Sequence, residues 1–210
     1  MANKLAYINR VAAALQGKDL KGLFPSVIIA QAILESAWGE SALAKTYNNH
    51  FGMKKGSGTN YGGWNGQTVT LKTGEVVNGQ NITVNGVFRV YPSLEASIED
   101  HNGLFYTLSR YKAVCSAKTP REQITAIKNG GYATATHYVD SVMNVINSNN
   151  LTRFDNMAGG TITNNNDGSP TPTPSMQTSK EYKMNTKTLS IVIIVAGLAL
   201  AAIGGYNLLF

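Results

Sequence analysis

One acid in this sequence stands where it could donate a proton. Glu35 lies near the end of an apolar stretch, 27–34, whose side chains recur at the spacing of a helix packed against a core. Pro25 suits the first turn of that helix, and Gly39 suits a left-handed stop after it. Apolar neighbours make a carboxylate costly to ionise and raise its pKa. A carboxyl group that is protonated near neutral pH can act as a general acid on a glycosidic oxygen. The alternative is a solvated acid at a helix end.

Cys115 is the second residue that could do chemistry, as the nucleophile of a cysteine peptidase paired with His50, His101 or His137. However, Val114-Cys-Ser provides no helix start or glycine-rich turn that would lower the pKa of the thiol. A small buried hydrophobic side chain is the alternative that we favour. The three histidines lack metal-ligand spacing, so we expect no metal site and no cofactor.

Periodicity indicates the elements that must position Glu35. An amphipathic helix is expected at 3–16, and it is too polar to be a secretory signal peptide. Four β-branched runs between residues 67 and 91 are separated by Gly74, Asn78-Gly79 and Asn85-Gly86, which predicts a small antiparallel β-lobe of short strands. Glu75 is expected at the first turn or at a strand end of this lobe. On its own it is typical of an exposed strand-edge acid.

Helices are expected again after the lobe. Ser93 is a predicted N-cap, and Thr119-Pro-Arg-Glu combines a capping threonine with proline at the first helical position. A last helix is predicted at 138–148. Between the last two helices, residues 129–134 form a glycine-containing loop that presents Tyr132. An exposed loop tyrosine is commonly a packing residue.

Four blocks of the sequence, in the same order, resemble one known family. They are Gln31-Ala-Ile-Leu-Glu-Ser-Ala-Trp-Gly-Glu-Ser, Tyr47-Asn-Asn-His-Phe-Gly-Met-Lys, Tyr91-Pro-Ser-Leu-Glu-Ala-Ser-Ile-Glu-Asp, and Gly131-Tyr-Ala-Thr followed by Tyr138. From about Ala2 to Phe154 the chain resembles the glucosaminidase domain of glycoside hydrolase family 73, which includes flagellar and autolytic peptidoglycan hydrolases. The chain departs from the family in having Ala135-Thr136 where Asp-Pro often follows the tyrosine motif.

The resemblance implies a fold and a set of catalytic roles. The fold would be α+β, a mainly α lysozyme-like domain with a small antiparallel β-lobe. Glu35 would be the general acid. Glu75 would match the second acid, on a mobile lobe, and would position or activate the attacking water. Tyr132 would lie in the cleft, where its hydroxyl could orient the N-acetyl group or stabilise the transition state.

Further side chains could contact a sugar. Aromatic rings can stack on a pyranose face, although a core position is an equal alternative for each; the candidates are Trp38, Phe51, Trp64, Tyr91 and Tyr106. Asn48 and Asn49 could bind acetamido groups or could simply shape a turn.

The sequence changes character after the first 155 residues, which are expected to form the catalytic domain. Residues 156–188 are rich in Gly, Thr, Asn and Pro and are typical of a linker. Residues 189–210 carry no charge and as a helix would rise by about 33 Å, enough to cross a hydrocarbon core of about 30 Å. We therefore expect a single-pass C-terminal transmembrane helix. Its flanking residues Lys180, Lys183 and Lys187 would favour a cytoplasmic enzyme domain.

Such an orientation, without a signal peptide, does not bring a wall hydrolase to its substrate by ordinary secretion. Two hypotheses resolve this: a hydrolase anchored in a virion membrane, or a phage lysis enzyme released by membrane damage. The net charge of +6 favours anionic partners. No arginine-rich helix or zinc spacing indicates nucleic acid. The expected partners are peptidoglycan glycan strands and, through the tail, a lipid bilayer; the oligomeric state stays open.

The function expected from these residues and the resemblance is hydrolysis of the β-1,4 bond between N-acetylglucosamine and N-acetylmuramic acid. Two alternatives stay open. A lytic transglycosylase also relies on one acid but leaves a 1,6-anhydro sugar. A non-catalytic wall-binding or structural membrane protein could retain the fold without the activity.

Overall fold

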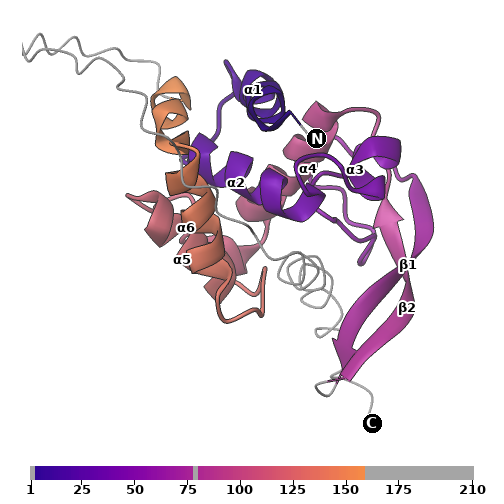
Figure 1. Cartoon of the computed structure of the whole chain (residues 1–210). Coiled ribbons are helices and arrows are strands. Elements are labelled where there is room, and N and C mark those ends of the chain that lie inside the picture. The colour runs from indigo at the N-terminus through magenta and orange to yellow at the C-terminus, as the bar shows by residue number, and fades with distance from the viewer. Residues whose placement is uncertain (1–2, 78–79, 159–210) are drawn as a thin grey trace, which may run out of the picture.

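The computed structural model describes residues 3–77 and 80–158. Its elements are α1 (Lys4–Leu15), α2 (Pro25–Ser36), α3 (Ala42–Tyr47), β1 (Thr68–Val77), β2 (Gln80–Arg89), α4 (Leu94–Thr107), the 3-10 helix η1 (Ser109–Tyr111), α5 (Pro120–Asn129), α6 (Tyr138–Ser148) and the 3-10 helix η2 (Leu151–Ala158). The helices form one body, from which the hairpin β1–β2 projects on the side away from α5 and α6 (Figure 1). This confirms the expected mainly α domain with a small antiparallel lobe.

Helix α2 is the centre of the helical body. All of its residues are buried, and it packs against α1, α5, α6 and η2. A helix that is apolar on every face has to be covered on every face, which explains this central place. Its first turn is held by the Asp155 carboxylate, which accepts hydrogen bonds from the Ser26 N–H at 2.7 Å and from the Ser26 hydroxyl at 2.8 Å. An acid at a helix N-terminus satisfies free N–H groups and complements the helix dipole.

The end of α2 differs from the expectation. The left-handed stop is not at Gly39 alone, because the chain turns left-handed already at Ala37 (φ 51°) and stays so through Trp38 (φ 64°) and Gly39 (φ 77°). Gly39 passes against the ring of Tyr7 so closely that a Cβ there would overlap it. The glycine is therefore needed for close packing as well as for its backbone angle.

The β-lobe is one long hairpin and not several short strands. Its register runs from Thr68 opposite Arg89 to Val77 opposite Gln80. Gly74 and Asn85-Gly86, expected at turns, lie inside the paired strands, because continuous cross-strand pairing overrides their local turn preference. Glu75 correspondingly lies within β1, opposite Ile82, and not at a first turn or strand end.

A buried ion pair fixes the base of the hairpin to α4. The Arg89 guanidinium donates to both oxygens of Asp100, at 3.0 and 2.7 Å, and both side chains are almost fully buried. The Tyr91 hydroxyl donates to the same carboxylate at 2.6 Å, and Trp64 stacks on the guanidinium, 4.2 Å from ring centre to Cζ. Paired charges with satisfied hydrogen bonds are the form in which a buried ion pair is tolerated.

The predicted N-caps of α4 and α5 and the predicted range of α6 are confirmed. Asn3, Ser93 and Thr119 cap α1, α4 and α5 through their side chains, with Pro120 opening α5, and α6 spans the predicted residues 138–148. The Glu122 carboxylate reaches back to the Lys118 N–H at 2.8 Å.

The predicted linker and transmembrane helix, residues 156–188 and 189–210, lie almost entirely outside the described residues. Among the residues that are described, the structure contains no helix long and apolar enough to cross a membrane.

Candidate active site

Glu35 is buried in the last turn of α2, with 4% of its surface exposed. Burial raises the pKa of its carboxyl to about 8. The group therefore keeps its proton at neutral pH, as the apolar sequence around it predicts. One carboxyl oxygen, Oε2, has no hydrogen-bond partner among the described residues. A buried oxygen without a partner is unusual, and a bound substrate could supply one.

The loop after α3 brings a glycine backbone close to this carboxyl. A Cβ on Gly52, where φ is 63°, would lie 3.9 Å from Glu35 Oε2. The loop is shaped by Asn49, whose amide donates to the Met53 and Arg89 carbonyls and accepts from the Met53 N–H, each at 2.9 Å. The neighbouring Phe51 is fully buried. For Asn49 the structure favours turn shaping over sugar binding, because its amide is already satisfied.

Two tyrosines stand near Glu35. Burial raises the pKa of Tyr132 and Tyr138 well above the ordinary value, and the Glu35 carboxyl raises both further. Tyr132 is buried and not exposed on a loop, because it packs against α6 with its ring 6.1 Å from that of Tyr138. The Tyr132 hydroxyl has no partner among the described residues, whereas Tyr138 accepts a hydrogen bond from Gln31 Nε2 at 2.9 Å.

His101 supports the same group of rings from α4. It stacks on Phe51 with ring centres 3.9 Å apart and meets Phe105 and Tyr132 edge to face. Burial lowers the pKa of His101 to about 4, so the ring is neutral. Nδ1 lies 3.1 Å from the Asn102 amide oxygen, which accepts only, so Nδ1 carries the proton. Nε2 has no partner in the described part of the chain.

The turn after Glu35 is held by a chain of hydrogen bonds. Arg10 can only donate to His50 Nε2, at 3.3 Å, so His50 donates from Nδ1 to the Tyr7 hydroxyl at 2.9 Å. Tyr7 in turn donates to the Ser36 hydroxyl at 2.8 Å, and Ser36 donates to the Ala32 carbonyl at 2.6 Å. Burial lowers the pKa of His50 to about 4, in keeping with this neutral tautomer. The network fixes the backbone next to Glu35.

The remaining predicted residues are placed as follows. Trp38 is half-buried beside α1, with the Lys4 ammonium 5.2 Å from its ring centre. Asn48 donates to the Tyr91 carbonyl at 3.1 Å, and Trp64 donates from its indole to the Gln67 carbonyl at 2.8 Å. Tyr91 and Trp64 are buried beside the ion pair at the hairpin base, and Tyr106 donates to the Leu20 carbonyl at 2.9 Å. The structure therefore does not bring Trp64, Tyr91 and Tyr106 together with Glu35 through any contact described.

Sequence reasoning did not assign Gln31, His101 or Gly52 to the site. Gln31 stands one turn before Glu35, a spacing that places both on one helix face. That spacing could have identified it. His101 could not be found in this way, because its neighbours Phe51 and Tyr132 come from distant parts of the chain. The side chain of Glu75 lies outside what the structure describes.

The cysteine alternative finds no support. Cys115 is half-buried, and burial raises the pKa of its thiol, which disfavours the nucleophilic thiolate. Among the described residues, no group of three or more His, Cys, Asp and Glu side chains could hold a metal ion.

Comparison with known proteins gives consistent matches. The sequence profile of the glucosaminidase family, described as mannosyl-glycoprotein endo-beta-N-acetylglucosaminidase, matches residues 11–151. A probable N-acetylmuramidase of Lactococcus lactis subsp. cremoris is 38% identical over 76% of this chain and 37% of its own length. The exo-glucosaminidase LytG of Bacillus subtilis is 38% identical over 63% of this chain and 46% of its own length. The chain thus spans less than half the length of these two relatives.

Among solved structures, the catalytic domain of the autolysin Auto from Listeria monocytogenes superposes with a TM-score of 0.61. It is 34% identical, and the match covers 72% of this chain and 87% of that domain.

Proposed function

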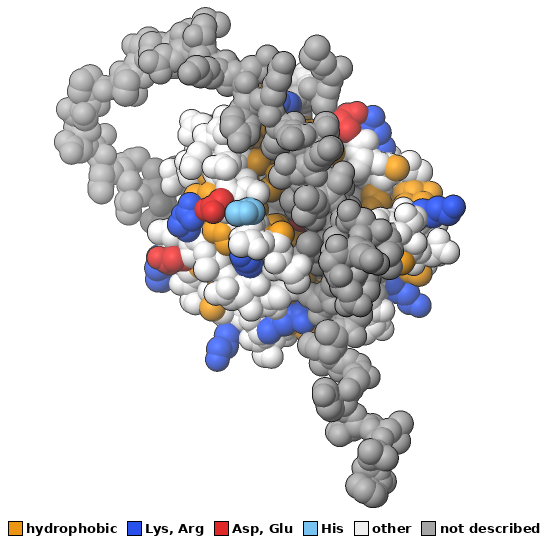
Figure 2. All heavy atoms as spheres, turned by 60° about the horizontal axis from the view of Figure 1, so that its bottom comes forward, with side chains coloured by type: hydrophobic (Ala, Val, Ile, Leu, Met, Phe, Trp, Pro, Cys, Tyr) orange, Lys and Arg blue, Asp and Glu red, His pale blue; other side chains and the backbone are white. Residues whose placement is uncertain are grey.

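Because this chain belongs to the glucosaminidase family, we propose that it is a peptidoglycan hydrolase that cleaves the β-1,4 bond between N-acetylglucosamine and N-acetylmuramic acid. The observation that carries the proposal is the buried Glu35, whose raised pKa keeps it protonated at neutral pH. The net charge of +6 suits an anionic wall polymer. Figure 2 shows one face on which Lys and Arg side chains are spread widely and Asp and Glu side chains are few.

Glu35 acts as the general acid. Its carboxyl proton passes to the glycosidic oxygen as the bond from that oxygen to the anomeric carbon breaks. Water then supplies a hydroxyl to the anomeric carbon, and its proton returns to the Glu35 carboxylate, either directly or after transfer to a second base. Glu35 Oε2 and the Tyr132 hydroxyl are buried and have no hydrogen-bond partner among the described residues, and in this proposal they bind the reacting sugar and its acetamido group. The neutral rings of Phe51 and His101 keep this region apolar.

Glu75 is the second acid of the proposal. It lies on β1 in the projecting hairpin, on the element to which the family resemblance assigns the residue that assists the water. The acetamido group of the substrate is the alternative source of that assistance. If Glu75 assists the water directly, its carboxylate should lie about 6.5–9.5 Å from that of Glu35, which is the separation found in inverting glycosidases.

Replacing the acid by its amide tests the proposal. Glu35→Gln keeps the shape of the side chain and removes its proton, so activity on purified peptidoglycan is expected to fall about 100-fold or more. Glu75→Gln is expected to be less damaging, because a second acid is easier to bypass. Glu99→Gln removes an exposed acid of α4 and serves as the control, with activity within about twofold of the wild type. Near-native turnover by a folded Glu35→Gln protein would remove Glu35 from the mechanism.

The names of the relatives favour two different bonds. One is a probable N-acetylmuramidase and another an exo-glucosaminidase, which cut on opposite sides of the same sugar. We propose the glucosaminidase bond, because the profile that matches two thirds of the chain is that of a glucosaminidase family, whose description names hydrolysis after N-acetylglucosamine in a different polymer. A lytic transglycosylase is the second candidate, since it needs the same single acid.

We also propose that residues 189–210 anchor the enzyme in a membrane, through a linker at 156–188. The support is the uncharged apolar sequence itself, flanked by Lys180, Lys183 and Lys187. A virion membrane or a host cell membrane is the proposed location.

A further inference from the structure

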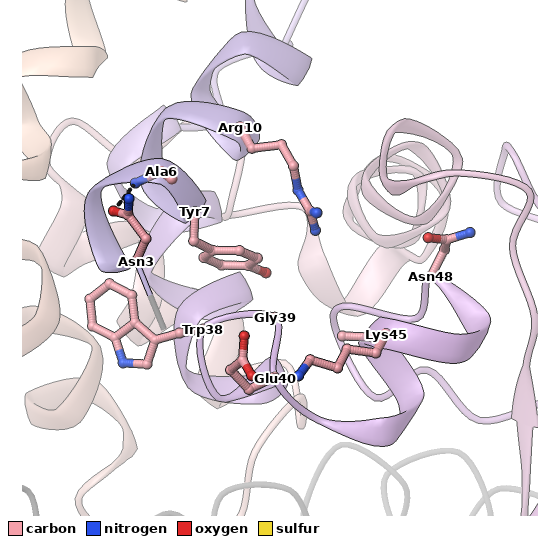
Figure 3. Close-up of a pocket in the computed structure, with 10 residues that line it drawn as sticks. Asn3, Ala6, Tyr7, Arg10, Trp38, Gly39, Glu40, Lys45 and Asn48 are labelled. Carbon is pink, nitrogen blue, oxygen red and sulfur yellow. Dashed lines mark hydrogen bonds and ion pairs between the residues drawn. The ribbon is translucent and has the colours of Figure 1, made fainter. Parts of the chain in front are cut away.

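A hollow of about 340 Å³ lies between α1 and the turn that joins α2 to α3 (Figure 3). Tyr7 and Arg10 enter it from α1, Trp38 and Glu40 from the turn, and Lys45 from α3. It adjoins the catalytic helix, because the Tyr7 hydroxyl on its wall binds Ser36, the residue after Glu35. None of the roles assigned above to Glu35, Glu75 and Tyr132 uses this hollow.

The backbone of its wall is strained where it presents an aromatic ring. Ala37 and Trp38 are both left-handed although neither is glycine, at a cost of roughly 1–2 kcal/mol each. The turn leaves Trp38 half-buried, with one part of the indole facing the hollow. Strained residues are retained most often at functional sites, where the surrounding structure holds them.

The charges around the hollow favour an anion. Lys45 and Glu40 form an exposed ion pair at 2.5 Å and largely cancel each other. Arg10 uses one N–H on His50 and lies 5.5 Å from the centre of the Tyr7 ring. Its charge also interacts with that of the Glu95 carboxylate on α4, although the two side chains form no direct ion pair. The Lys4 ammonium lies over the Trp38 ring. Among the charged residues that line the hollow, Arg10 is therefore the one without a direct ion pair in the described part of the chain, and Lys4 adds a positive charge beside Trp38.

We propose that this hollow binds a carboxylate of the peptide stem that the wall polymer carries, with Arg10 as the anchor and Trp38 as the apolar contact. The inference rests on the proposed function. Each N-acetylmuramic acid along a glycan strand carries a short peptide with free carboxylates and alanine methyl groups. A strand bound at Glu35 brings such a stem to the neighbouring surface. A guanidinium matches a carboxylate in shape and charge, and the indole face suits a methyl group.

The test compares two forms of one substrate, glycan strands that keep their stems and the same strands stripped of them. With the full 210-residue chain, Arg10→Gln is expected to raise KM on stem-bearing strands about five times as much as on stripped strands; the ratio removes any effect that the variant has on the network beside Glu35, which both substrates share. Lys45→Gln should act in the same direction, because it frees the Glu40 carboxylate to repel the stem. Glu40→Gln should lower KM on stem-bearing strands. Lys112→Gln removes an exposed charge outside the hollow and should change neither value.

A titration that needs no hydrolysis separates this proposal from the proposed function. Free stem peptide should quench the tryptophan fluorescence of the wild type at lower concentration than that of Arg10→Gln, and added salt should reduce the difference. If the wild type cleaves neither strand yet binds the peptide through Arg10, the hydrolase proposal fails, but the proposal that the hollow binds the stem carboxylate is supported. The stem site would be overturned if Arg10→Gln changed KM equally on both kinds of strand. It would also be overturned if Glu40→Gln did not lower KM on stem-bearing strands. An effect that appears only on walls with phosphate polymers would also overturn it.

Discussion

Glu35 becomes a proton donor through two features of its place in α2. Its carboxyl is almost fully buried, which disfavours the charged form. It also stands in the last turn, where the free carbonyl groups of a helix make the surroundings negative and disfavour an anion further. Ser36, Tyr7 and His50 lock the backbone beside it without placing a cation against the carboxyl. This arrangement keeps the Glu35 carboxyl protonated and fixes the backbone that orients it.

The pKa of Glu35 sets a pH dependence of the reaction. Only the protonated carboxyl donates, so kcat is expected to fall as the pH rises through about 8. A pH series of initial rates on soluble glycan strands between pH 5 and pH 10 measures the alkaline limb. A kcat that already falls at pH 5 would contradict the assignment, because Glu35 would then have an ordinary carboxyl pKa.

The raised pKa of Glu35 also allows its burial to be tested through protein stability. The folded pKa of Glu35 exceeds its unfolded value, so the stability that the neutral carboxyl contributes is present at low pH and is lost as the pH rises from 4.5 through about 8. Glu35→Gln cannot ionise and escapes this loss. Its Tm relative to the wild type should therefore increase between pH 5 and pH 9, by about 2–4 °C for each kcal/mol of difference. A constant difference in Tm would show that Glu35 is not buried in solution.

At the scale of elements, the hairpin that carries Glu75 is held to the helical body at its base. Arg89, Asp100 and Tyr91 form a closed set of buried hydrogen bonds there. Arg89 also donates to the carbonyls of Lys54 and Thr59 in the preceding loop. The position of Glu75 relative to Glu35 therefore depends on this ion pair.

Breaking the pair should be costly. Asp100→Asn leaves the Arg89 guanidinium buried without its counter-charge, and we expect the free energy of unfolding to fall by about 3–5 kcal/mol. Asp140→Asn breaks the Arg121–Asp140 pair, in which both side chains are more than half exposed, and should cost less than about 1 kcal/mol. Urea unfolding followed by circular dichroism measures both. Equal effects of the two substitutions would show that the hairpin base is not buried as described.

Local signals explain which elements could be predicted. Ser93 and Thr119 cap helices by bonding to N–H groups three residues later, so their sequence neighbourhood is sufficient. Gly74 and Asn85-Gly86 misled the strand prediction, because pairing along the whole hairpin, which the local sequence does not contain, outweighs their turn preference. Helix α3, which the sequence did not indicate, is short and ends at the left-handed Asn48.

The residues of the candidate site also fall into two groups, those that the local sequence predicts and those that it does not. The burial of Glu35 follows from its apolar neighbours in sequence and is confirmed. The partners of His101 and the satisfied amide of Asn49 depend on residues from loops and helices far apart in the chain. No single stretch of sequence encodes them, which is why Asn49 could be read equally as a sugar ligand.

At the scale of the whole molecule, the C-terminal end of the described domain contacts its central helix. Asp155, in the last described element, caps the first turn of the central α2 and so joins the two ends of the domain. A chain truncated after Ala158 keeps this contact.

The truncated chain should therefore fold and cleave peptidoglycan, whereas the full chain should sediment with membranes and resist extraction by high salt or carbonate. Attachment through surface lysines alone would be released, because salt screens such contacts within about 8 Å or less. Fractionation of both chains after membrane preparation measures the difference. A full chain that is freely soluble without detergent would refute the anchor, and a folded but inactive truncated chain would refute the independent domain.

The most direct test of the central claim is the chemical identity of the new chain end. Purified peptidoglycan is digested by the wild type and by Glu35→Gln, the products are reduced with borohydride, and their masses are determined. We predict reducible N-acetylglucosamine ends from the wild type and at most about 1% as much product from Glu35→Gln. Products one water lighter, with a 1,6-anhydro end, would identify a transglycosylase. Undiminished product from Glu35→Gln, or none from a folded wild type, would contradict the assignment of Glu35 as the acid of a peptidoglycan hydrolase.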